Sequence, residues 1–125
     1  MDFLAPMGRP PAGSYRAMGV RSRIAGMDTR TLGGTGERVS AMGLGCMGMV
    51  GWYGTRDDAE ARATLHRALD LGINHLDTAA VYQAGDNERF VGECIRGRRH
   101  QVFLATKCGM ERSPEGKVVA DNRPE

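Results

Sequence analysis

Three polar residues in the second half of the chain combine functional groups that can move a proton: Asp77, Tyr82 and Lys107. Asp77 ends one short apolar segment, Tyr82 lies in the loop beyond it, and Lys107 ends another apolar segment. A free phenol has a pKa of about 10 and is a poor acid at neutral pH, but a neighbouring ammonium favours the phenolate form. A carboxylate beside the lysine would keep the lysine charged and oriented. Such a set suits protonation of a carbonyl oxygen in a substrate that receives a hydride.

The same residues also have purely structural interpretations, which their spacing leaves open. Asp77 and Thr78 could cap a loop or the next turn. Tyr82 could be an ordinary loop aromatic, and Lys107 a solvated lysine at a strand end. Their occurrence together at neighbouring strand ends favours the catalytic interpretation, because active sites of parallel α/β folds lie at that edge.

The three histidines are assigned to structural positions. His75 lies two residues before Asp77 and faces the same side of a strand, so we expect it in a barrel interior rather than acting as a general base. His66, on a predicted helix, and His100, in a basic turn, are expected to be exposed to solvent.

Regular patterning begins at Thr29 and predicts the elements that would position these groups. Thr29–Leu32 and Arg38–Ala41 flank four residues of glycine and threonine, Gly33–Gly36, which predicts a β-hairpin. The run Val39–Leu44 then feeds a strand, and a glycine-rich loop follows.

Two helices are predicted by capping residues and apolar periodicity. The first begins at Thr55, its expected N-cap, and stops at Gly72. Its buried face repeats at helical spacing and comprises Ala61, Leu65, Ala68 and Leu69. The second is capped by Asn87 and ends at Gly97. Its buried stripe comprises Phe90, Val91, Cys94 and Ile95.

Short apolar strands are predicted before and after the second helix, at Ile73–Asp77 and Val102–Thr106. Residues 108–125 are polar and show no further periodic element. Strands and helices that alternate through short linkers imply parallel strands with right-handed crossovers. The fold class is therefore α/β, either a (β/α)8 barrel or a doubly wound sheet.

A glycine motif at Gly43–Gly48 reads G-L-G-C-M-G and formally matches the pattern of dinucleotide-binding folds. In those folds the helix opens at the glycines, and an acidic residue ends a strand about 20 positions later. Here the predicted helix opens only near Asp57, and no acidic residue stands at the required place. A different α/β nucleotide-binding domain is kept as an alternative that this motif alone supports.

Composition excludes several classes of protein. The chain has 125 residues, of which 41% are apolar and 26% charged, as in ordinary globular proteins. No apolar run approaches the ~18 residues of a transmembrane helix, so no membrane partner is expected. A net charge of +2 gives no reason to expect a nucleic-acid partner. The three cysteines lack metal-ligand spacing, so we expect no metal and favour a cytoplasmic location.

The first 26 residues differ from the rest, with prolines, arginines and no apolar face. We interpret residues 1–26 as a disordered leader or a start-site artefact, with a transit peptide as the alternative. The patterned unit would then begin at Met27 and cover residues 27–125.

Four segments resemble the aldo-keto reductase family, over about residues 28–125: Arg38–Met49, Leu71–Tyr82, Gly85–Glu93 and Leu104–Lys107. The first resembles the family's first strand, and the second, L-G-I-N-H-L-D-T-A-A-V-Y, its aspartate and tyrosine segment. The third resembles the N-E…G-E stretch and the fourth the strand that supplies the lysine. The resemblance implies the N-terminal part of a (β/α)8 TIM barrel behind a β-hairpin.

The resemblance also implies roles for individual residues. Tyr82 would be the general acid, with Lys107 and Asp77 beside it. Three residues of the loop after the first strand would line the NADPH site together with Asp77: Gly45, Cys46 and Met47. The implied reaction is the NAD(P)H-dependent reduction of a small aldehyde or ketone. The family's fourth catalytic residue, a histidine after the fourth strand, has no candidate in this sequence.

A complete barrel of this kind needs about 250 residues. We therefore expect a barrel truncated after about three β/α units. The chain would belong to an oxidoreductase family, but this polypeptide alone would be inactive. The alternative is a non-catalytic relic or interaction module with the same fold, as in potassium-channel β-subunits.

Overall fold

A computed structural model describes residues 26–51 and 53–123 of the chain. The proposed leader, residues 1–26, lies outside the described residues apart from Gly26. The elements are, in order, β1 (Thr29–Thr31), β2 (Arg38–Ser40), β3 (Gly43–Gly45), the 3-10 helix η1 (Met47–Val50), α1 (Asp58–Asp70), β4 (His75–Asp77), η2 (Tyr82–Gly85), α2 (Asp86–Ile95), η3 (Arg99–Gln101), β5 (Phe103–Ala105), β6 (Met110–Arg112) and β7 (Val118–Ala120).

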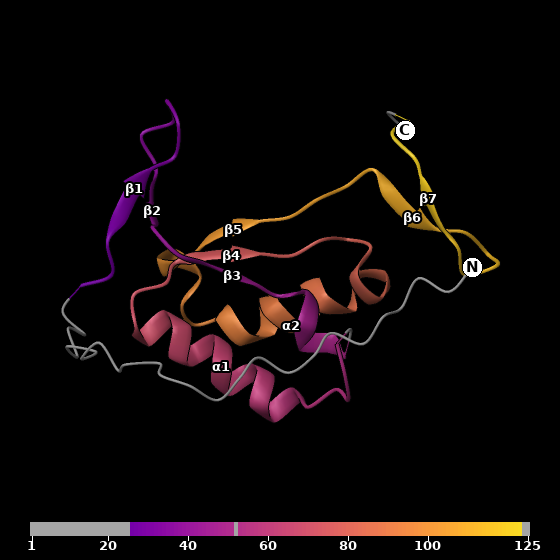
Figure 1. Ribbon diagram of the computed structural model, residues 1–125, viewed down its shortest axis with the longest axis horizontal. Coiled ribbons are helices and arrows are strands. Elements are labelled where there is room, and N and C mark those ends of the chain that lie inside the picture. Colours follow the sequence, from indigo (N-terminus) through magenta and orange to yellow (C-terminus); the bar gives the residue numbers. More distant parts are fainter. Residues whose placement is uncertain (1–25, 52, 124–125) are drawn as a thin grey trace, which may run out of the picture.

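The centre of the fold is a parallel sheet in the order β3-β4-β5, as the alternation of strands and helices predicts. Helices α1 and α2 cover the same face of this sheet, and the hairpins β1–β2 and β6–β7 project at its two ends (Figure 1). The predicted parallel β-α-β units are confirmed, and within the described residues the three strands do not close a barrel. A barrel segment and one half of a doubly wound sheet share this arrangement.

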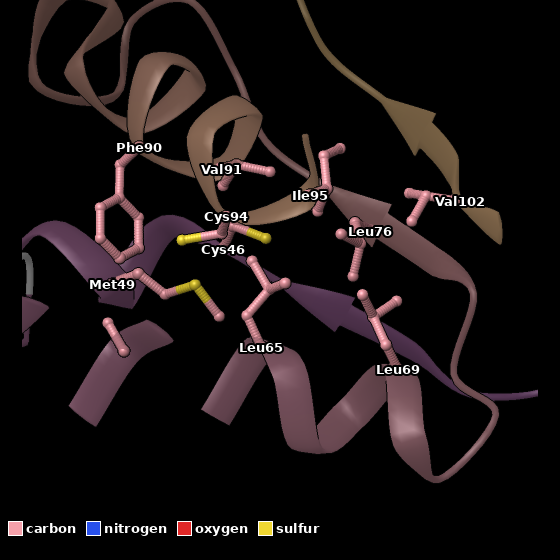
Figure 2. Close-up of a cluster of buried hydrophobic side chains, with 11 residues drawn as sticks. Cys46, Met49, Leu65, Leu69, Leu76, Phe90, Val91, Cys94, Ile95 and Val102 are labelled. Atoms are coloured by element: carbon pink, nitrogen blue, oxygen red, sulfur yellow. The ribbon is translucent and has the colours of Figure 1, made fainter. Parts of the chain in front are cut away.

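The core lies between the sheet and the two helices. Leu44, Leu76 and Leu104 stand in register on neighbouring strands and face the helices. Leu76 and Leu65 are completely buried, and each such side chain contributes roughly 1.5–3 kcal/mol to folding. Figure 2 shows the buried side chains of α1 and α2 converging on the sheet. Both predicted buried stripes are confirmed in full.

The start of α1 differs from the prediction. Asp57, not Thr55, is the N-cap, and its carboxylate accepts hydrogen bonds from the backbone N–H groups of Ala59 and Glu60 at 3.0 and 2.9 Å. A carboxylate satisfies two of the unpaired N–H groups at once and also favours the positive end of the helix dipole. The predicted stop at Gly72 agrees with its left-handed conformation, φ 85°.

The start of α2 also corrects the sequence interpretation. Gly85, with φ 85°, occupies the N-cap position, and the helix begins at Asp86. The predicted cap, Asn87, lies within the first turn and is completely buried. Its side chain therefore serves neighbouring segments rather than its own helix end.

The predicted strand Val39–Leu44 is divided into β2 and β3. The division comes from Ser40, whose backbone N–H donates to Asn74 Oδ1 at 2.7 Å and whose hydroxyl donates to the carbonyl of Met42 at 2.6 Å. These bonds turn the chain out of the hairpin and into the parallel sheet.

A second hairpin was not predicted. β6 pairs with β7 in antiparallel register, and Gly116, with φ 80°, lies in the turn between them. Both strands have three residues and are exposed on both faces, so no alternation of apolar and polar residues marks them. Pro114 lies in the same turn.

Two further expectations are settled by side-chain positions. His66 is half-buried, so its predicted exposure was wrong. Its Nε2 lies 3.0 Å from the carbonyl oxygen of Cys94, a contact that links α1 to α2. His100 is exposed as expected.

All three cysteines are free thiols. Within residues 26–51 and 53–123, no helix has the length and apolar character needed to cross a bilayer, and no cluster of metal-binding side chains occurs.

Candidate active site

Asp77, Tyr82 and Lys107, the three residues singled out for proton transfer, meet at one edge of the sheet. The Lys107 ammonium donates to Asp77 Oδ1 at 2.5 Å and to the carbonyl oxygen of Thr78 at 2.9 Å. It also lies 3.4 Å from the Tyr82 hydroxyl and 5.2 Å from the centre of the Tyr82 ring. One ammonium thus joins a carboxylate, a backbone carbonyl and a phenol.

The register of the sheet explains why these groups meet. Asp77, the last residue of β4, stands opposite Ala105, the last residue of β5. Lys107 follows Ala105 by two positions, which keeps it on the same side of an extended chain as Asp77. The pairing continues beyond both strands, with N–H bonds from Thr78 to Ala105 at 2.9 Å and from Ala80 to Lys107 at 3.1 Å. The two strand exits are therefore held side by side.

The charge state of the lysine follows from these contacts. The hydrogen bond that Lys107 donates to Asp77 is the largest factor that raises the pKa of Lys107 above its ordinary value, and the contact with Tyr82 adds to it. Lys107 is accordingly an ammonium at neutral pH. The side chains of Lys107 and Asp77 are 51% and 43% exposed, so water screens the pair and its contribution to folding is small. The main effect of the Lys107–Asp77 pair is to place a positive charge beside the Tyr82 hydroxyl.

The loop that carries Tyr82 has an unusual backbone. Gln83 and Ala84 have φ of 49° and 52°, in the left-handed region that side chains disfavour, and Gly85 follows at φ 85°. A left-handed conformation costs an L-residue roughly 1–2 kcal/mol. Such strain persists only where neighbouring structure imposes it, and it often accompanies functional sites. Here it shapes the turn between the tyrosine and α2.

The loop after β3 carries the residues that we assigned to the cofactor. Gly45 is exposed and stands opposite Asp77, with nothing within 4 Å of the position that a Cβ would take. Met47 is half-buried. Cys46 is completely buried in the core, where burial raises the pKa of its thiol to about 11. Its side chain belongs to the core cluster, and its backbone N–H donates to the Asp77 carbonyl at 2.8 Å.

The glycine motif and His75 also find their places. The first and second glycines of the motif belong to β3, and α1 opens only at Asp58, so the helix does not begin at the glycines. His75 is half-buried on the same face of β4 as Asp77, and its ring meets Phe103 edge-on at 5.4 Å.

Sequence reasoning missed two buried polar residues of this region. Thr78 is 1% exposed and donates its hydroxyl to Asn87 Oδ1 at 2.5 Å. Asn87 donates its amide to the carbonyl oxygen of Cys46 at 2.7 Å. The signal available in the sequence was a polar residue placed directly before the apolar stripe of α2, which we interpreted as a helix cap.

Comparison with known proteins identifies the family. The sequence profile of the aldo/keto reductase family matches residues 41–124, which is most of the chain. The chain therefore belongs to the aldo/keto reductase family. The matched residues include the whole β3–β5 sheet and all three residues that meet at its edge.

Similar proteins come from bacteria and yeast. The chain is 39% identical over 100 residues to aldo-keto reductase yakc (NADP(+)) of Schizosaccharomyces pombe, covering 78% of this chain and 29% of that protein. It is 46% identical over 83 residues to the uncharacterized oxidoreductase YqkF of Bacillus subtilis, covering 66% and 26%.

Solved structures agree with the fold. The aldo-keto reductase AKR11C1 of Bacillus halodurans matches with a TM-score of 0.66 and 42% identity, over 77% of this chain and 31% of that one. The glycerol dehydrogenase AKR11B4 of Gluconobacter oxydans matches with a TM-score of 0.67 and 37% identity, over 78% and 32%. The sheet and its helices thus match part of the barrel of aldo-keto reductases, which favours a barrel segment over half of a doubly wound sheet. The chain spans about three tenths of the length of these relatives.

Proposed function

We propose that this chain supplies the proton-donating part of an NADPH-dependent carbonyl reductase, with Tyr82 as the general acid. The observation that carries the proposal is the single ammonium of Lys107, which contacts both Asp77 and the Tyr82 hydroxyl. The family to which the chain belongs is one of oxidoreductases. Its relative yakc carries NADP(+) in its name, and a relative from Klebsiella pneumoniae was solved with NADPH.

The residues present are compatible with a nicotinamide against this edge of the sheet. Gly45 stands opposite Asp77 with open space at the position of a Cβ, and the half-buried Met47 follows it by two positions. Cys46 would contribute only backbone, because its side chain is buried. The cofactor, when bound, supplies the hydride for the carbonyl carbon of an aldehyde or ketone.

The side chains of this chain would handle the proton. Tyr82 gives its hydroxyl proton to the carbonyl oxygen as negative charge develops there. The Lys107 ammonium stabilises the phenolate that is left behind, and Asp77 keeps that ammonium charged and in place.

A chimera tests this assignment. The chain from Met27 onward is joined to the C-terminal part of a close relative, and turnover of a generic aldehyde is followed by NADPH oxidation. We expect Tyr82→Phe to lower kcat by about 10²–10⁴-fold, with cofactor affinity nearly unchanged, since a positioned acid contributes that much. Lys107→Met should also abolish most of the activity.

Matched variants serve as controls. Tyr53→Phe removes a hydroxyl from a tyrosine that is 78% exposed, and Lys117→Met removes the other lysine of the chain, which is exposed in a hairpin. Both should retain activity. If Tyr82→Phe kept more than about a third of the parent rate, when loss of an essential acid costs at least ~10²-fold, Tyr82 would not be the acid.

A further inference from the structure

Three consecutive residues in the first turn of α2 reach three different segments around the site. The carboxylate of Asp86 accepts a hydrogen bond from Arg56 at 3.0 Å, in the loop before α1. Glu88 accepts one from the Thr106 hydroxyl at 2.6 Å, directly after β5. Asn87, between them, points into the interior and is completely buried. The first turn of α2 thus contacts the surroundings of every strand exit in the sheet.

Asn87 makes the buried link. Its amide donates to the carbonyl oxygen of Cys46, at the exit of β3, and its carbonyl oxygen accepts from the Thr78 hydroxyl, at the exit of β4. The links from Asp86 and Glu88 are exposed to solvent, where such contacts contribute little. A buried polar side chain, in contrast, is costly unless its partners are fixed, so its bonds define geometry.

Thr78 connects this link to the catalytic lysine. Its hydroxyl donates to Asn87, and its backbone carbonyl accepts from the Lys107 ammonium at 2.9 Å. Thr78 directly follows Asp77, which holds the same ammonium at 2.5 Å. Any movement of Thr78 therefore displaces both oxygens that orient Lys107.

We propose that Asn87 is a positioning residue: by clamping Thr78 to the β3 exit, it fixes the two oxygens that aim the Lys107 ammonium at Tyr82. As a statement about geometry it concerns the chain itself; as a statement about catalysis it rests on the proposed function. It assigns a role to the N-E segment that the general acid and its lysine leave unexplained.

The test reads Lys107 directly. The chain contains two lysines, so labelling with ¹³C,¹⁵N-lysine gives two side-chain signals, and Lys117 serves as an internal control. The midpoint of the Lys107 titration is followed by NMR in the full chain and in four variants. Asn87→Ala removes the clamp, Thr78→Val removes one hydroxyl while keeping the shape, and Thr78→Ser restores that hydroxyl. Gln101→Ala, an exposed amide before β5, is the matched control.

We expect the Lys107 midpoint to fall toward the ordinary lysine value of 10.5 in Asn87→Ala and Thr78→Val. It should stay at the parent value in Thr78→Ser and Gln101→Ala, and Lys117 should not move in any variant. An unchanged midpoint in a folded Asn87→Ala or Thr78→Val overturns the proposal. So does a loss of the dispersed spectrum in both, since Asn87 would then hold the fold rather than the site.

Activity separates this proposal from the function on which it rests. In the chimera, Asn87→Ala should lower kcat roughly 10- to 10²-fold with little change in KM, as expected for misplaced reacting groups. If Tyr82→Phe stays active while Lys107 responds to Asn87→Ala, the general acid is wrong and the clamp stands. If Tyr82→Phe is inactive and the Lys107 midpoint does not change in Asn87→Ala, Tyr82 is the general acid and Asn87 is not a positioning residue.

Discussion

Replacing Ala84 by glycine should stabilise the fold, although glycine normally destabilises. Ala84 is exposed and has φ 52°, a conformation that costs an L-residue roughly 1–2 kcal/mol. Glycine adopts it freely but loses about 0.5–1 kcal/mol more backbone entropy on folding. The balance is a gain of about 0.5–1 kcal/mol in the free energy of unfolding, or roughly 2–6 °C in Tm.

Ala63→Gly is the matched control, because Ala63 is exposed in the middle of α1. It should lose about 0.5–1 kcal/mol. The difference between the two substitutions cancels the intrinsic effect of glycine and leaves the cost of the left-handed backbone, about 1–2 kcal/mol. Urea unfolding followed by circular dichroism gives both values. Equal destabilisation by the two variants would show that Ala84 carries no strain and that the loop of Tyr82 is not under tension.

Other expectations concern the sheet, the lysine and the thiols. Gly43→Ala should be less stable than Gly45→Ala by about 1 kcal/mol, as measured by urea midpoints. A Cβ at Gly43 would lie 3.3 Å from the His75 ring and push that ring off its rotamer, whereas within residues 26–51 and 53–123 no atom beyond the chain neighbours lies within 4 Å of a Cβ at Gly45. The raised pKa of Lys107 means that its contacts stabilise the fold below pH 10.5 and that this contribution is lost as the pH rises through the raised value. Lys107→Met should remove that alkaline loss in unfolding curves measured on either side of pH 10.5, and an unaltered pH profile would contradict it. N-ethylmaleimide should label Cys108 first, as judged by peptide mass spectrometry, because burial raises the pKa of Cys46 and Cys94; early labelling of either buried thiol would show that the core opens readily.

The parallel sheet and its two helices could be predicted because their signals are periodic. Each helix presents a complete apolar stripe, and each strand of the sheet carries at its centre a leucine that packs against the helices. The hairpin β6–β7 could not be predicted, because a strand exposed on both faces needs no alternation. The predicted start of α1 also differed from the observed one, because the side chain of Asp57 accepts hydrogen bonds from two N–H groups of the first turn.

The three residues of the candidate site could be predicted from the sequence, but the buried hydrogen bonds of Asn87 that hold the neighbouring segments could not. Asp77, Tyr82 and Lys107 have functional groups whose chemistry is visible in the sequence, and parallel topology places them at one edge. The role of Asn87 was not visible, because the same side chain fits a helix cap equally well. Only the packing of α2 against the sheet shows that its amide bonds to Cys46 and Thr78.

The sequential order of strands in the sheet has a consequence for how the site forms. Lys107 lies 30 positions from Asp77 and 25 from Tyr82, and Asn87 lies 41 from Cys46. Each strand of this sheet pairs with the next one along the chain. These separations are non-local, and parallel strands pair slowly because the intervening chain must close first. Every group in these contacts nevertheless lies at or before Lys107, so the proton-donating arrangement needs no residue that is synthesised later.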